Sequence, residues 1–360
     1  MKRVIDIGLL QSQSGHYAAL SRVVSAGVLQ GVAEVNASPA FDLAFNVHAR
    51  DPECRAERYA PLCRQILRET PARHIFGCVT SSSRKDVIPE LERHDGILWY
   101  PLPYEGFEAS ERVAYMHSCP NQHLLPLLDW AIPTLGPRGY LIGSNYIWGW
   151  EIAQIARERI TGAGGLVMGD RYLATGDTEA DHIIAEIEAL RPDFILNSLI
   201  GDSSYSFMRQ LAGLRAQSGA ALPVLSCNFT EVEIDSCGGA AEGLVSAGPW
   251  FEPTDDQGDR RRGSLAEMAR LAVHELAQLL HGRPGAGDLS LAELTQLALA
   301  AGQPLRLDPT HFHARQPVVI AQIQGGRFHE VLRHPPRTAD PYLTGRERGL
   351  TLRPPLRVVS

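Results

Sequence analysis

Small polar and aromatic side chains follow many of the strand-like stretches of this sequence. They stand in "QSQSG" (11–15), "TSSS" (80–83), "YPLPYE" (100–105), "SNYIW" (144–148), "GDSS" (201–204) and "NFTE" (228–231). Hydroxyl, amide and carboxylate groups can pair with the donors and acceptors of a small polar molecule, and aromatic rings can exclude water from it. The chemistry indicated is recognition of a small molecule in a pocket.

The serine, threonine, asparagine and aspartate residues at these positions have a second interpretation, because such residues commonly cap the N-termini of helices. Both interpretations stay open for each of them. Aromatic residues do not cap helices, and several stand at strand ends: Tyr100, Tyr104, Tyr146 and Trp148. These four favour the pocket.

The sequence lacks a recognisable set of catalytic or cofactor-binding residues. "IGDSSYS" has no glycine two places after Ser203 or Ser204, so it is not a nucleophile elbow, and no GxGxxG or phosphate loop follows a strand. His311 and His313 would share one face of a strand, but no further metal ligands are identified. The six cysteines show no CxxC pairing and fit reduced thiols. We therefore predict that the protein is not an enzyme and holds no cofactor and no metal.

The elements that must position the strand-end residues follow a regular alternation. Strand-like runs are expected at 4–10, 41–49, 73–79, 97–103, 138–145, 165–173, 193–200 and 222–228, each followed by a helical or turn segment. Strands that alternate with helices of about 10 to 15 residues indicate parallel βαβ units, and hence two α/β domains. Ligands of such sheets bind beyond the carboxyl ends of the strands.

The last third of the sequence differs from this alternation. It predicts two long amphipathic helices, near 262–282 and 289–302, and then a hairpin with Gly325 and Gly326 at its turn.

Composition limits the function classes. A chain of 360 residues with 44% hydrophobic and 21% charged residues is long enough for about two domains of roughly 150 residues. The net charge of -7 is spread along the chain, which disfavours direct nucleic-acid binding. The arginine run 260–262 stands beside several aspartates and is interpreted as a solvated loop or helix start.

The apolar run "VIDIGLL" near the N-terminus is too short for a signal peptide, and no segment approaches the ~18 apolar residues of a membrane helix. We therefore predict no membrane segment and a cytoplasmic location, unless the chain is a trimmed precursor of an exported protein.

Several of these stretches carry a resemblance to a known family. "IGLLQSQSG", "ILWYPLPYEGFE", "LIGSNYIWGWE" and "NSLIGDSSYSF" resemble the type I periplasmic-binding-protein family. They are most similar to its branch of AmiC-type amide sensors, which are negative regulators of aliphatic amidase expression, and of urea-binding receptors of ABC transporters. The resemblance implies two Rossmann-like parallel-sheet domains joined by three hinge crossings, with the ligand between them. The first domain would be 1–120 plus 247–324, and the second 121–246 plus 325–360.

The resemblance also implies a set of ligand-binding residues. Its members match pocket positions of that branch or lie next to them: Ser81, Ser82, Tyr100, Leu102, Tyr104, Glu105, Tyr146, Trp148, Asp202, Thr230 and Glu231. Leu102 stands where the amide sensors have a threonine, and the wall at Trp148 is bulkier than is usual there. Asp202 would accept from an NH2 group. Glu105 has the alternative role of an ion-pair partner across the cleft.

The function implied is that of a cytoplasmic sensor for a short aliphatic amide, urea or a similar ligand. An amide offers N–H donors and a carbonyl acceptor, which hydroxyls and carboxylates can satisfy. In the AmiC branch the partner is an RNA-binding antitermination regulator of an amidase operon. The alternative is the substrate-binding receptor of an ABC transporter for urea, amides or branched-chain amino acids. A homo-oligomer is left open.

Overall fold

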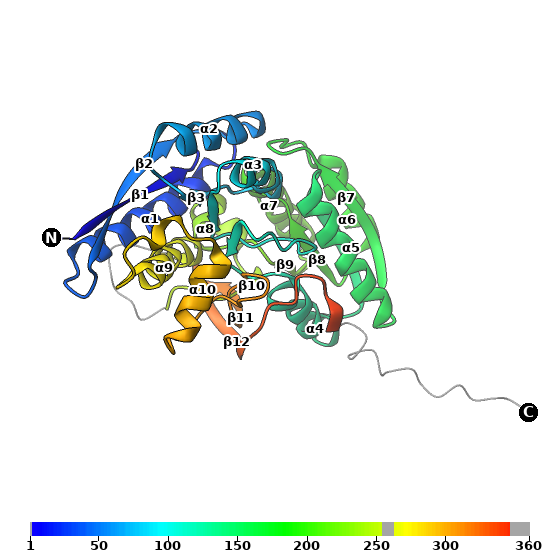
Figure 1. Cartoon of the computed structure of the whole chain (residues 1–360). Helices are drawn as coiled ribbons and strands as arrows, with labels where there is room; N and C mark the ends of the chain where they lie inside the picture. Colours follow the sequence, from blue (N-terminus) through cyan, green and yellow to red (C-terminus); the bar gives the residue numbers. More distant parts are fainter. Residues whose placement is uncertain (1, 254–262, 346–360) are drawn as a thin grey trace, which may run out of the picture.

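The computed structural model describes residues 2–253 and 263–345, which fold into two β-sheets covered by helices (Figure 1). The alternation of strands and helices predicted from the sequence is present around both sheets. The arginine run 260–262 lies outside the described residues, so its expected loop or helix start stays a prediction.

The first sheet is parallel throughout. Its strand order is β2 (Leu43–Arg50), β1 (Arg3–Leu10), β3 (His74–Gly77), β4 (Ile97–Tyr100) and β5 (Val113–Tyr115). Crossover helices connect its first four strands, because parallel neighbours cannot be joined by a tight turn. These helices are α1 (Ala18–Ala37), α2 (Ala56–Glu69) and α3 (Ser81–Arg93). Every residue of β3 and β4 is buried, as expected for strands covered on both faces.

The second sheet is mixed. Its order is β12 (Arg327–Arg337), β11 (Gln316–Gln324), β10 (Val245–Gly248), β9 (Val224–Ser226), β8 (Phe194–Ser198), β6 (Arg138–Ser144) and β7 (Leu166–Leu173). Strand β11 is antiparallel to both β10 and β12, and the other pairs are parallel. The α/β prediction is confirmed, but this sheet is not wholly parallel, because the predicted hairpin adds two antiparallel strands at one edge.

Helices from distant parts of the sequence complete the two units. Those beside the second sheet are α4 (Leu124–Leu135), α5 (Ile147–Gly162), α6 (Asp181–Leu190), α7 (Gly201–Ser218) and α8 (Glu231–Cys237). The late helices are α9 (Gly263–Leu280) and α10 (Leu291–Ala300). Figure 1 shows α9 beside α1, on the side of β1 and β2, while α5, α6 and β7 lie on the opposite side. Helix α9 therefore packs on α1, a helix of the first sheet.

The predicted division into domains stays a prediction, and the sheets suggest one change to it. The sequence placed residues 247–324 with the first domain, but β11 hydrogen-bonds to β10 in the second sheet. We therefore place the last crossing before Gln316.

The buried side chain of Gln122 hydrogen-bonds to two other segments that run between the sheets. The Nε2 of Gln122 donates to the carbonyl of Ala314 at 3.1 Å and to that of Arg337 at 2.9 Å. The segment after β5 is thereby hydrogen-bonded both to Ala314, just before β11, and to Arg337, the last residue of β12. Such a joint allows a cleft between the sheets to have a defined geometry.

Helix α1 is long and apolar enough to cross a membrane by length and composition alone. Its side chains Val24, Val28 and Val35 are fully buried in the protein, and its other side is covered by α9. This is the burial expected of a core helix in a layered α/β fold.

The contact between α1 and α9 gives a prediction about stability. A Cβ on Gly27 would lie 2.2 Å from the carbonyl oxygen of Ala266, so Gly27→Ala must push the two helices apart. We expect a loss of about 1–3 kcal/mol in the free energy of unfolding, measured by urea denaturation. The control is Gly213→Ala on α7, where a Cβ meets nothing within 4 Å. A gain of up to about 1 kcal/mol is expected there, from helix propensity. Equal effects of the two substitutions would contradict the close contact.

Candidate functional site

A small cavity lies where the carboxyl ends of the two sheets face each other. Its volume is about 30 Å³, and it is lined by Leu20, Val79, Ser81, Leu102, Pro103, Tyr146, Trp148, Ile200, Asn228 and Leu265. Four of these residues follow β3 or β4 of the first sheet: Val79, Ser81, Leu102 and Pro103. Four others follow β6, β8 or β9 of the second sheet: Tyr146, Trp148, Ile200 and Asn228. A cavity made by strand ends of two sheets is the usual place for a ligand in open α/β folds.

The cavity wall is apolar with a few polar atoms. None of the described residues that line it is charged. The indole Nε1 of Trp148 donates to the carbonyl of Ser198 at 2.9 Å, and the Nδ2 of Asn228 donates to that of Leu199 at 3.0 Å. The hydroxyl of Tyr146 forms no hydrogen bond with another described residue. Tyr146 is therefore available to a ligand.

A cluster of buried charges lies directly behind Ser81. The Arg84 guanidinium is fully buried, and its nitrogens lie 2.9 Å from Glu105 and 2.7 Å from Glu108. The Oγ of Ser81 donates a hydrogen bond to Glu105. Lys85 also contacts Glu108, at 2.7 Å. The cavity is thus connected to ion pairs through a single serine hydroxyl.

Aromatic residues enclose the same cluster. The guanidinium carbon of Arg84 lies 4.9 Å from the ring centre of Tyr100 and 4.8 Å from that of Tyr104, which is cation–π geometry. Tyr100 donates to the carbonyl of Val79 at 2.8 Å, and Tyr115 donates to Glu108 at 2.6 Å. These rings hold the charges away from water.

The pKa values of the cluster follow from its pairing. Burial would lower the pKa of Arg84, but Glu105 and Glu108 raise it well above its usual value. Burial would raise the pKa of Glu108, but Arg84, Lys85 and Tyr115 lower it to about 2. Both groups are therefore charged at neutral pH.

His313 belongs to this enclosure. Its ring stacks on Tyr115 with the ring centres 4.0 Å apart, and its Nε2 is hydrogen-bonded to the hydroxyl of Tyr104. Burial lowers the pKa of His313 to about 3, so the ring is neutral at pH 7. Within residues 2–253 and 263–345, no group of three or more His, Cys, Asp or Glu side chains could hold a metal ion.

The structure brings part of the predicted ligand set to the cavity. Ser81, Leu102, Tyr146 and Trp148 line it. Tyr100, Tyr104 and Glu105 lie in the cluster behind it. Glu105 pairs with Arg84 of the same unit, so the alternative of an ion pair across the cleft is not what the geometry shows.

The remaining predicted residues lie elsewhere. Ser82 is in the first turn of α3 and does not line the cavity. Asp202 is exposed, and its backbone N–H donates to the carbonyl of His16 at 3.1 Å, which joins the two units at the mouth of the cleft. Thr230 and Glu233 form a capping box at the start of α8. For Thr230 the geometry therefore matches the capping interpretation.

Glu231 links the second sheet to the late helices. Its carboxylate accepts the backbone N–H groups of Glu252 and Ser264, both at 2.8 Å. Ser264 stands in the first turn of α9, where unpaired N–H groups favour a carboxylate. The geometry gives Glu231 a joining role between the units.

The predicted ligand set lacked six residues of the lining: Leu20, Val79, Pro103, Ile200, Asn228 and Leu265. Asn228 stood in the marked "NFTE" and Ile200 immediately before "GDSS", so both could have been found from their places at strand ends. Leu20 and Leu265 lie in α1 and α9 and carry no local signal, because an apolar residue on a helix is normally part of the core.

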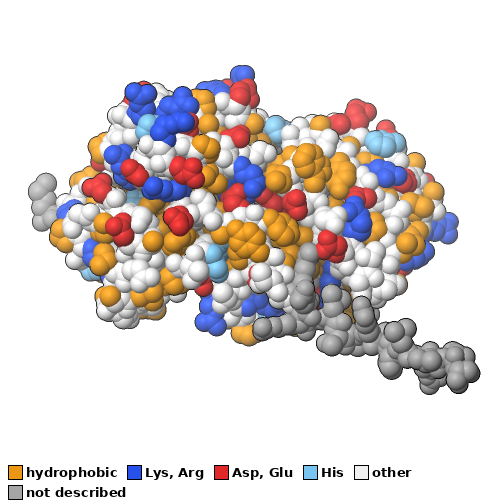
Figure 2. All heavy atoms as spheres, turned by 45° about the vertical axis from the view of Figure 1, so that its right-hand side comes forward, with side chains coloured by type: hydrophobic (Ala, Val, Ile, Leu, Met, Phe, Trp, Pro, Cys, Tyr) orange, Lys and Arg blue, Asp and Glu red, His pale blue; other side chains and the backbone are white. Residues whose placement is uncertain are grey.

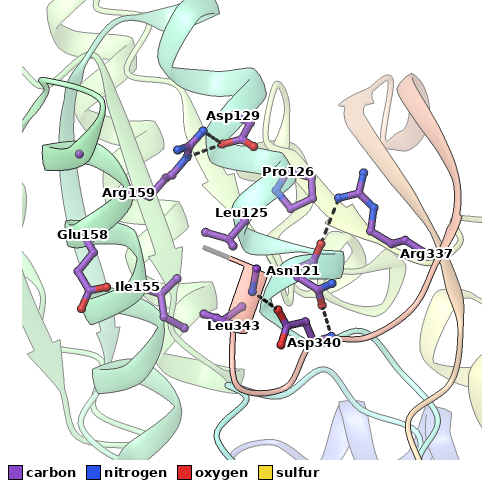
Figure 3. Close-up of a pocket in the computed structure, with 12 residues that line it drawn as sticks. Asn121, Leu125, Pro126, Asp129, Ile155, Glu158, Arg159, Arg337, Asp340 and Leu343 are labelled. Carbon is purple, nitrogen blue, oxygen red and sulfur yellow. Dashed lines mark hydrogen bonds and ion pairs between the residues drawn. The ribbon is translucent and has the colours of Figure 1, made fainter. Parts of the chain in front are cut away.

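A second, larger hollow lies between α4, α5 and the C-terminal segment (Figure 3). Its volume is about 350 Å³, and it shares no residue with the cavity at the strand ends. Asp129 and Arg159 pair across it, and the side-chain oxygen of Asn121 accepts the backbone N–H of Asp340 at 2.9 Å. The first contact joins α4 to α5, and the second fastens the C-terminal segment to the turn before α4.

The surface gives no sign of a nucleic-acid site on the face drawn in Figure 2. Side chains of Lys and Arg are interspersed there with those of Asp and Glu and with hydrophobic ones. Nucleic-acid binding needs basic residues gathered in one patch or stripe, and the described residues on this face do not form one.

Comparison with known proteins shows the family to which the chain is related. A family model described as "Periplasmic binding protein domain" matches residues 5–262. A solute-binding protein of an ABC transporter from R. palustris, solved with benzoate, is 17% identical, with 94% of this chain and 98% of that one covered and a TM-score of 0.80.

Amino-acid-binding proteins show a similar fold. The leucine-binding protein LivK from Thermotoga maritima is 15% identical, with 91% of this chain and 98% of that one covered and a TM-score of 0.76. LivJ from Streptococcus pneumoniae, solved with isoleucine, is 16% identical, with 92% and 100% covered and a TM-score of 0.76. At such identities the likeness establishes the fold.

The prediction of a cytoplasmic location is wrong. The family model that matches residues 5–262 is that of periplasmic binding proteins, and this finding overturns the cytoplasmic prediction. The prediction depended on the absence of a signal peptide, but such a peptide is removed from the mature protein. The first residues of a chain therefore do not report its location.

The low pKa of Glu108 predicts acid sensitivity. Its pKa is about 2 in the folded protein against an ordinary value of 4.5, so the unfolded chain binds more protons below pH 4.5. Stability from this group is present above that pH and is lost as the pH falls towards 2. At 1.36 kcal/mol per pKa unit the loss is roughly 3 kcal/mol.

The measurement is urea unfolding at pH 7, 5 and 3 for the wild type and Glu108→Gln. We expect the variant to be less stable at pH 7 and to lose less stability on acidification. Glu188→Gln, on the exposed face of α6, serves as the control and should follow the wild-type profile. Parallel pH profiles for the wild type and Glu108→Gln would contradict the assignment.

Proposed function

The chain belongs to the periplasmic binding protein domain family, and on that premise we propose that it is a solute-binding receptor of the ABC-transporter type. Its ligand, in this proposal, is a short uncharged amide or a urea-like molecule held between the two units. Members of the family are binding proteins rather than enzymes, and several similar structures are receptors for small molecules.

One observation carries the choice of ligand: a hydroxyl side chain from each unit, Ser81 and Tyr146, lines the cavity, and none of its described lining residues is charged. The Ser81 oxygen, from the first unit, can accept an N–H group. The Tyr146 hydroxyl, from the second unit, can donate to a carbonyl. An amide carries both of these groups within a few atoms.

Charged ligands fit this lining less well. Benzoates and amino acids, the ligands of the similar receptors, carry a carboxylate that would need a cation. The buried cation nearest to Ser81, Arg84, is already bound to Glu105 and Glu108. A buried charge without a partner is strongly unfavourable. The volume of about 30 Å³, which is room for roughly two water molecules, also disfavours a solute as large as benzoate in this arrangement.

The importer role is favoured over the regulatory role that the sequence resemblance suggested. No similar protein reported above is a regulator, so an RNA-binding partner and an amidase operon have no support beyond the resemblance. The same holds for a homo-oligomer. In the receptor role, the ligand favours the closed arrangement by its higher affinity for it.

Calorimetry and thermal shift with the purified protein test the proposal. The ligands are acetamide, propionamide, urea, benzoate and isoleucine. We expect saturable binding of an amide or urea and a higher melting temperature, because a ligand that binds only the folded state stabilises it. Saturable binding of benzoate or isoleucine, with no response to amides or urea, would contradict the proposed ligand class.

Tyr146→Phe tests the donor. Loss of one hydrogen bond to an uncharged ligand is expected to weaken amide binding about tenfold, or roughly 1.4 kcal/mol. Tyr342→Phe removes the same atom from a side chain that is 52% exposed and outside the cavity. Its dissociation constant should equal that of the wild type. Equal affinities of all three proteins would remove Tyr146 from the site.

A further inference from the structure

We propose that Glu105 sets the hydrogen-bonding specificity of the site by holding the Ser81 oxygen as an acceptor. The site would then select solutes that present an N–H donor and reject solutes of the same shape that offer only acceptors. This inference rests on the proposed function above, and it concerns a residue that does not line the cavity.

The first step is the hydrogen bond between Ser81 and Glu105. A serine hydroxyl has one hydrogen to donate, and Ser81 donates it to Glu105. The carboxylate cannot return a proton, because it is ion-paired with Arg84 at 2.9 Å. Ser81 is 2% exposed and lines the cavity, so what it shows the ligand is a lone pair.

The second step concerns Arg84. Its Nη1 lies 3.4 Å from the Ser81 oxygen, and a guanidinium can only donate. This long contact also keeps the Ser81 hydrogen directed at Glu105. If the hydroxyl rotated its hydrogen towards Arg84, the hydrogens of two donors would face each other. Both neighbours of Ser81 in the cluster therefore leave it an acceptor.

The third step is the loop that fixes Glu105. Gly106 and Phe107 have φ of 86° and 57°, and the backbone N–H of Phe107 donates to the carbonyl of Pro341 at 2.7 Å. A Cβ on Gly106 would lie 2.8 Å from that carbonyl oxygen. Glu105 itself is 1% exposed. The carboxylate is thus placed by a backbone that cannot easily relax.

Tyr146 supplies the opposite polarity from the second unit. Burial raises its pKa well above the usual value, and the nearby Tyr100 and Glu105 raise it further, so the hydroxyl keeps its proton. A ligand with an N–H group and a carbonyl can bridge Ser81 and Tyr146. A ketone can satisfy only Tyr146, and its other side would face the lone pair of Ser81.

The test compares nearly isosteric ligands. Acetone replaces the NH2 group of acetamide by a methyl group, and butanone does the same for propionamide. The measured quantity is the ratio of dissociation constants, ketone over amide, by calorimetry. We expect at least a tenfold preference for the amide in the wild type.

Glu105→Gln should bring this ratio to within about threefold of unity, because the new amide can donate to Ser81 and free its hydrogen for the ligand. Ser81→Ala should do the same. Glu108→Gln is the matched control: it removes a carboxylate from the same arginine but not from Ser81, so the ratio should stay at its wild-type value. A loss of folding stability alone would not change the ratio of the two dissociation constants, because it affects both ligands equally.

The outcomes separate the two proposals. If the wild type prefers the amide and Glu105→Gln keeps that preference, the role of Glu105 is overturned and the proposed function stands. If the wild type binds neither amides nor urea, the proposed function fails and this inference falls with it. Should Glu105→Gln not fold, Arg84→Gln combined with Glu105→Gln removes one charge of each sign, and the same ratio decides.

Discussion

The site depends on the compensation of one buried charge, that of Arg84. Its side chain has no exposed surface, so it must be neutralised by Glu105 and Glu108. Three tyrosine rings cover it, and Lys85 and Tyr115 balance the second carboxylate. Removal of any one charge leaves the cluster with a net charge that nothing in it compensates. The strand ends around the cluster are therefore held in one arrangement.

This compensation explains how a cavity with uncharged walls can lie beside an ion cluster. The charges satisfy one another, and they act on the cavity through the hydrogen bond from Ser81 to Glu105 and through their field at Tyr146. The other unit contributes Tyr146 and Trp148, and Trp148 is already bound to Ser198. Recognition would then need both units at once, one for the acceptor and one for the donor. A ligand that uses both favours closure.

Both apolar packing and hydrogen bonds join the two units, because one cluster of buried hydrophobic side chains contains residues of both, such as Tyr100 and Trp148. Gln122 fastens the crossing segments, Glu231 accepts two backbone N–H groups near α9, and the carbonyl of His16 meets the backbone N–H of Asp202. Each of these three is a local hydrogen bond. Such contacts can be exchanged for water when the cleft opens, whereas the packing of α1 on α9 cannot.

The sequence by itself determined the alternation of strands and helices and the hairpin at Gly325 and Gly326, because hydrophobic periodicity and turn chemistry are local. The four predicted residues that line the cavity came from the family resemblance and from their places at strand ends. The sequence did not reveal the short strands β5 and β10, whose pairing comes from neighbours far along the chain. Only the tertiary structure decided that Glu105 meets Arg84 rather than the ligand, that Thr230 caps a helix, and that Leu20 and Leu265 line the cavity. The physical reason is that side-chain partners are set by how distant segments pack, and no spacing in the sequence encodes that packing.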